Sequence, residues 1–203
     1  MARDSGPIEH KKASSGKNAY SRWMLVLLVS QAVNLLPRAF SLIPGAGVIS
    51  ILCLQLASVC RLLCLFQLSH ACARYRTAAA LQCIPLILFF TRFIPAVRPP
   101  FEQTFLILSS LCTLAAAFYE YSGHADVIAS KTPVLAAQWR RLFVIQLLLA
   151  ALEHVGTPLF YKAVFPRSPA CSIIYFVVFT ITGVLFQIVY IRHLLKMYRF
   201  TRA

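Results

Sequence analysis

Long apolar stretches alternate along the chain with short polar or proline-containing breaks. Six of these stretches approach the roughly 20 residues that an α-helix needs to cross about 30 Å of hydrocarbon. They cover residues 23–43, 48–73, 77–96, 101–121, 142–161 and 170–191. This pattern predicts an all-α fold: a polytopic membrane helical bundle with six transmembrane helices.

The first stretch is the least regular of the six. Pro37 and Arg38 interrupt it, and because proline removes a backbone donor, the segment is either a kinked crossing or a shorter re-entrant element. The residues before it do not form a secretory signal, since the apolar run is too long and no small-residue cleavage site follows. We therefore expect a basic tail at 1–22, a transmembrane domain at 23–191 and a basic C-terminal tail at 192–203.

The basic residues are distributed unevenly between the two sets of connections. With six crossings, the two tails and the second-to-third and fourth-to-fifth connections share one side of the membrane. That side has fourteen basic residues: Arg3, Lys11, Lys12, Lys17, Arg22, Arg74, Arg76, Lys131, Arg140, Arg141, Arg192, Lys196, Arg199 and Arg202. The other side has four: Arg38, Arg98, Lys162 and Arg167. The positive-inside rule predicts that both termini are cytoplasmic, and we expect residence in the cytoplasmic membrane.

The composition supports a membrane protein over a soluble one. Hydrophobic residues make up 59% of the 203-residue chain and charged residues 13%, whereas soluble domains carry about 25% charged residues. The net charge of +14 could suggest nucleic-acid binding, but the basic residues stand between apolar runs and form no solvated basic face. The expected partner is the lipid bilayer, with a second membrane chain as a candidate and no nucleic acid.

Glu153 and His154 stand near the middle of the fifth predicted crossing. A carboxylate at that depth costs several kcal/mol unless it pairs, protonates or faces water. Gln146 precedes Glu153 by seven residues, which places both side chains on one side of the helix. These residues indicate either a ligand or proton site, or a structural ion pair with Arg61 or Arg92, the two arginines inside predicted crossings.

A second polar stripe occupies the sixth predicted crossing. Thr180, Gly183, Gln187 and Tyr190 recur at steps of three and four residues, and we expect this stripe to pack against the one that carries Glu153. Such residues often hold transmembrane helices together through hydrogen bonds and close contact. Gln187 is therefore a candidate for helix packing as well as for the ligand site.

The richest polar cluster follows the fourth predicted crossing. It consists of Glu120, His124, Asp126, Arg140 and Arg141. One interpretation is an interfacial loop in which Glu120 or Asp126 pairs with Arg140 or Arg141. The other is a lipid-modifying site in which the acids and the histidine perform acid–base or metal chemistry and the arginines bind a phosphate. A histidine one turn from a glutamate is two ligands only, so no metal site is predicted.

The chain carries no motif that names an activity. The phosphate-binding loop G-x-x-x-x-G-K-[ST], the zinc motif H-E-x-x-H and the nucleophile motif G-x-S-x-G do not occur in it, and no cofactor is indicated. We rank a small-molecule or ion binding or transport component first. The alternatives are a non-catalytic accessory or assembly protein and, third, an interfacial lipid-modifying enzyme.

Overall fold

The computed structural model describes residues 7–37, 47–91, 98–153, 160 and 168–202. These residues form six α-helices and no strand: α1 (Pro7–Val33), α3 (Gly47–Leu68), α4 (Ala73–Thr91), α5 (Arg98–Ala129), α6 (Pro133–Ala151) and α8 (Pro169–Arg202). The predicted all-α class is confirmed for this part of the chain.

Four helices have segments long and apolar enough to cross a membrane: Val48–Leu68, Thr104–Ala129, Pro133–Ala151 and Ile173–Arg202. The protein is therefore a multi-pass membrane protein by the length and composition of its helices. The other two helices are more polar, because α1 begins in the basic segment 7–22 and α4 carries Arg74 and Arg76 in its first turn.

Three helices extend further than the sequence pattern indicated. The segment 7–22, expected as a tail, belongs to α1, α5 continues past Tyr121 to Ala129, and α8 continues through the expected C-terminal tail to Arg202. Gly123 lies inside the extension of α5, although glycine lowers helix propensity by about 1 kcal/mol relative to alanine. Burial of His124, Ala125 and Ile128 in this extension of α5 explains the difference, since tertiary packing overrides local propensity.

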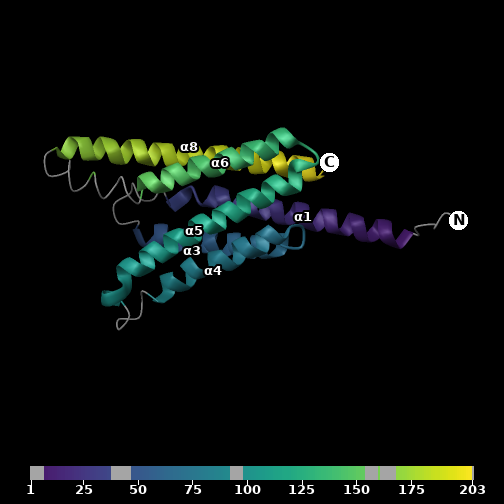
Figure 1. The fold of residues 1–203 in the computed structure, drawn as a ribbon, viewed down its shortest axis with the longest axis horizontal. Helices are drawn as coiled ribbons and strands as arrows, with labels where there is room; N and C mark the ends of the chain where they lie inside the picture. The colour runs from purple at the N-terminus through teal and green to yellow at the C-terminus, as the bar shows by residue number, and fades with distance from the viewer. Residues whose placement is uncertain (1–6, 38–46, 92–97, 154–159, 161–167, 203) are drawn as a thin grey trace.

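Successive helices run in opposite directions (Figure 1). Each helix makes its most extensive contacts with two neighbours, and these contacts close a ring in the order α1, α3, α4, α5, α6, α8 and back to α1. The α3–α4 turn, the α5–α6 turn and the last residues of α8 lie at the same end of the bundle (Figure 1). We call this the basic end, because Arg74, Arg76, Lys131, Arg199 and Arg202 belong to it.

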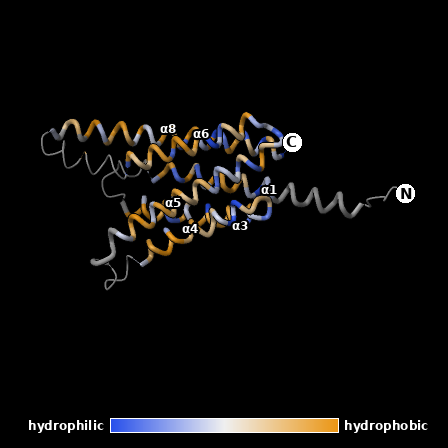
Figure 2. The backbone as a smooth tube through the Cα atoms, in the orientation of Figure 1, coloured by the Kyte–Doolittle hydropathy of each residue, from blue (hydrophilic) through white to orange (hydrophobic). Residues whose placement is uncertain are grey.

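The best-packed core lies toward the basic end. Trp139, Tyr75, Leu65, Leu194 and Met197 are among its fully buried side chains. Polar residues also concentrate at this end, whereas the opposite half of the bundle is mostly apolar along its length (Figure 2). Many apolar side chains there point outward, as expected for helices whose surroundings are lipid.

Candidate functional site

A cavity of about 760 Å³ opens between α5, α6 and α8 in the more apolar half of the bundle. Its polar lining residues come from three helices: Ser109, Ser110 and Thr113 of α5, Gln146 of α6 with Glu153 just beyond its end, and Thr180 and Gln187 of α8. We call it the polar cavity. Its volume lies in the range of roughly 300–1,000 Å³ that small-molecule sites occupy.

The two predicted polar stripes meet in this cavity. Gln146 and Glu153 line one wall, and Thr180, Gly183 and Gln187 line another. The two stripes therefore line a common space between the helices, and their direct packing against each other stays a prediction. Tyr190 departs from its stripe, because it lies deeper in the bundle and bonds to Glu120.

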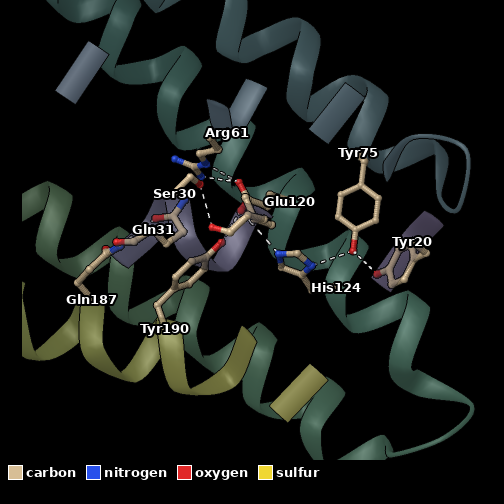
Figure 3. A network of polar contacts seen from close by, with 10 residues as sticks. Tyr20, Ser30, Gln31, Arg61, Tyr75, Glu120, His124, Gln187 and Tyr190 are labelled. Atoms are coloured by element: carbon tan, nitrogen blue, oxygen red, sulfur yellow. Dashed lines mark hydrogen bonds and ion pairs between the residues drawn. The ribbon is translucent and has the colours of Figure 1, made fainter. Parts of the chain in front are cut away.

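Glu153 is exposed to the cavity and forms no ion pair with a described residue. The carboxamide oxygen Oε1 of Gln146 is buried without a hydrogen-bond partner. Gln187 is held in place from α1, because its Nε2 donates to Gln31 Oε1 at 2.8 Å and to the Gln31 carbonyl at 3.2 Å (Figure 3). The cavity wall thus carries the unpaired carboxylate of Glu153, a Gln146 carboxamide whose buried Oε1 has no partner, and a Gln187 carboxamide that α1 holds in place.

Arg61 does not pair with Glu153, which corrects one interpretation of the sequence. Its Nε lies 2.9 Å from Oε2 of Glu120 on α5, and Nη2 bonds to the same oxygen (Figure 3). The hydroxyl of Tyr190 on α8 donates to the other carboxylate oxygen, Oε1. Three helices therefore converge on one buried carboxylate. Arg92 and His154 lie outside the described residues.

A line of aromatic and polar groups continues from this pair toward the basic end. His124 Nε2 lies 3.6 Å from Glu120 Oε1, and His124 Nδ1 is hydrogen-bonded to the Tyr75 hydroxyl at 2.8 Å (Figure 3). The Tyr75 hydroxyl lies 3.4 Å from that of Tyr20. Burial raises the pKa of both phenols above the usual value. The Trp139 ring covers His124 at a centroid distance of 4.5 Å.

The predicted interfacial cluster is not a single site. Glu120 and His124 are fully buried, whereas Asp126 is partly exposed and pairs with Arg74 at 2.7 Å. Arg140 and Arg141 are exposed. The expected pairing of either acid with Arg140 or Arg141 is wrong, because the extended α5 turns Glu120 toward α3 and Asp126 toward α4. Across the described residues, no group of three histidine, cysteine or acidic side chains could hold a metal ion.

A smaller cavity of about 280 Å³ lies beside the Arg61–Glu120 pair. Arg61, Gln55 and Gln82 line it, and Oε1 of Gln82 is buried without a partner. It shares Leu54, Ser109 and Thr113 with the polar cavity. Sequence reasoning missed the hydroxyls of α5 and the hydrogen bond between Tyr190 and Glu120. The four-residue step from Ser109 to Thr113 was a usable signal for the hydroxyls, whereas the polar stripe identified Tyr190 without its partner.

No family model matches the chain, and no match was found to a curated protein or a solved structure. Any function must therefore be argued from the geometry of the cavities.

Proposed function

We propose that the protein is a membrane-embedded binding or transport component for a small cation, which Glu153 holds in the polar cavity. The observation that carries the proposal is the position of Glu153: an unpaired carboxylate that lines a cavity together with Gln146 and Gln187. Ionisable residues inside membrane segments commonly mark ligand or ion pathways.

The charges of the described interior support a cationic ligand. Arg61 and Glu120 neutralise each other at 2.9 Å, so Glu153 is left as the uncompensated charge among these three groups. A carboxylate in an apolar environment gains several kcal/mol from a counter-charge. A bound cation would supply that charge, and Gln146 Oε1 would accept a hydrogen bond from it.

The geometry favours this function over the two alternatives. An accessory protein whose polar stripes serve packing alone predicts no cavity between them, and a cavity of about 760 Å³ is present. A lipid-modifying enzyme at the interface requires Glu120, His124 and Asp126 to converge with Arg140 and Arg141. These side chains diverge, with Glu120 bound to Arg61 and Asp126 bound to Arg74.

The proposal includes six crossings with both termini on the cytoplasmic side of the cytoplasmic membrane. The alternating helix directions and the collection of basic residues at one end support it (Figure 1). A membrane-impermeant maleimide applied from outside should label Cys171, at the start of α8, and spare Cys72, beside the α3–α4 turn. Mass spectrometry of the labelled peptides measures this; the reverse labelling would overturn the orientation.

Carbodiimide labelling of Glu153 tests cation binding directly. The full chain is placed in lipid nanodiscs and treated with dicyclohexylcarbodiimide, which modifies carboxyl groups in apolar surroundings, in the presence of sodium, potassium or butylammonium chloride. At least one cation should protect Glu153 several-fold at constant ionic strength, as judged by mass spectrometry of the peptide. Protection by none of the three would refute the proposal.

Two variants show whether the protection of Glu153 depends on the polar cavity. Asp126→Asn removes an acid that lies outside the cavity and should leave the protection of Glu153 unchanged. Gln146→Leu removes the neighbouring acceptor while keeping a similar volume, so higher cation concentrations should be needed for the same protection. A Gln146→Leu protein with unchanged protection would show that the cation does not occupy this part of the cavity.

A further inference from the structure

An apolar groove adjoins the polar cavity on the outer side of α5 and α6. It has a volume of about 510 Å³ and is lined by α5 residues between 106 and 114 and by Leu147, Ala150 and Ala151. Four residues line both spaces: Leu106, Ser110, Leu114 and Ala150. The groove and the polar cavity therefore meet along one shared wall between α5 and α6.

The outer side of the groove faces the region that lipid would occupy. Ile107 and Leu111 line the groove but not the polar cavity, and their exposed fractions are 62% and 60%. Both belong to the apolar segment Thr104–Ala129, which is long enough to cross a membrane. Exposed apolar side chains on such a segment face acyl chains, so the groove is accessible from within the bilayer.

The two spaces differ in the chemistry that they accept. Ser110 is the one hydroxyl-bearing residue that lines the groove, and the other lining side chains are aliphatic. The polar cavity is lined by the Glu153 carboxylate and by Gln146, whose buried Oε1 has no hydrogen-bond partner. Both of these groups accept hydrogen bonds, so they suit a positively charged group that donates them.

From this juxtaposition we infer that the ligand is a cationic amphiphile, a long-chain primary amine, whose ammonium group binds at Glu153 and whose aliphatic chain lies in the apolar groove. The inference rests on the proposed function, because it assigns a ligand class to the same carboxylate. The ligand reaches the cavity sideways from the bilayer, between α5 and α6.

The negative charge of Glu153 excludes a lipid head group that carries a phosphate. A phosphate group would lie beside the Glu153 carboxylate without a described basic residue that lines the cavity, and the repulsion between like charges would oppose its binding. The Arg61 guanidinium, which lines the neighbouring small cavity, is occupied by Glu120 through two of its nitrogens. A single amine without a phosphate is the head group that matches the described residues.

Photo-crosslinking tests the position of the chain. A dodecylamine that carries a diazirine midway along its chain is added to the full-length protein in nanodiscs, and the adducts are mapped by mass spectrometry. We expect adducts on the α5 and α6 residues of the groove that an excess of unlabelled dodecylamine removes. Glu153→Gln should lower this competed labelling about tenfold or more, the change in affinity that corresponds to about 1.4 kcal/mol.

A groove-filling variant separates this inference from the proposed function. Ala151 lines the groove but not the polar cavity, so Ala151→Trp should abolish the competed adducts while cations still protect Glu153 from carbodiimide. Ala80→Trp, at an exposed position of α4, serves as the matched control and should change neither result.

Three outcomes of these experiments distinguish the amphiphile from the cation site. Competed adducts that require Glu153 and disappear in Ala151→Trp would establish the amphiphile. Protection of Glu153 by sodium, potassium or butylammonium without competed adducts in the groove would overturn the amphiphile and leave the cation site in place. Absence of both signals would overturn the two proposals together.

Discussion

Arg61 of α3 and Glu120 of α5 form a buried ion pair, with Nε 2.9 Å from Oε2 and exposed fractions of 16% and 0% for the two side chains. Desolvation of two charges opposes such a pair, so its stability depends on further hydrogen bonds. Tyr190 supplies one of these bonds to the carboxylate. The pair links α3, α5 and α8 across the ring of helices, and it contributes to the alignment of the three.

Removal of one partner of this pair should destabilise the protein more than removal of both. Arg61→Met leaves the Glu120 carboxylate buried without its counter-charge, which we expect to cost about 3–5 kcal/mol. The double variant Arg61→Met, Glu120→Leu should recover a large part of that loss. Unfolding by sodium dodecyl sulfate in mixed micelles, followed by Trp fluorescence, measures the differences. Equal or greater instability of the double variant would contradict the structural role of the pair.

Replacing a carboxylate with its amide should have a small effect at Asp126, the exposed acid of α5. Asp126 pairs with Arg74 at 2.7 Å, with exposed fractions of 37% and 45% for the two side chains. Solvent screens such pairs, so Asp126→Asn should cost at most about 1 kcal/mol. Glu120→Gln, measured in parallel, should cost several times more. Comparable losses for the two variants would show that Glu120 is far more solvated than the geometry indicates.

Loss of the Tyr190 hydroxyl should weaken the packing of α8 against α5. Tyr190→Phe keeps the ring that contacts Trp139 but removes the donor to Glu120. Hydrogen bonds to charged groups contribute about 1.5–3 kcal/mol, and we expect a loss in that range. Tyr119→Phe is the control, since the described contact of Tyr119 is made by its ring with Phe118. The unfolding free energy should separate the two variants.

Gly123 allows the close approach of α4 to α5. A Cβ atom at this position would lie 3.0 Å from Cε1 of the buried Tyr75 ring. Gly123→Ala should therefore displace that ring, disturb its 2.8 Å hydrogen bond to His124 and cost about 1–3 kcal/mol. In a Tyr75→Leu background the same change should cost less, because the obstructing ring is gone. Equal costs in both backgrounds would contradict this contact.

The sequence alone was sufficient to predict the class of the fold and the residues of α6 and α8 that line part of the polar cavity. Runs of about 20 apolar residues predict helices with outward apolar surfaces, and the regular elements of the described part are all helices. Gln146 and Glu153 on one helix and Thr180 and Gln187 on another belonged to two predicted stripes, and they line one cavity. Helical periodicity is a local property, so it can be read along the chain.

The choice of partners was decided by the tertiary structure. From the sequence, Arg61 was a candidate partner of Glu153, and Arg140 and Arg141 were candidate partners of Glu120. In the bundle, Arg61 pairs with Glu120, and Arg74 pairs with Asp126. These pairs depend on the rotation of each helix and on which helices are neighbours in the ring. Both are set by packing among residues more than fifty positions apart. The sequence determined that buried charges need partners, and only the fold determined which ones they meet.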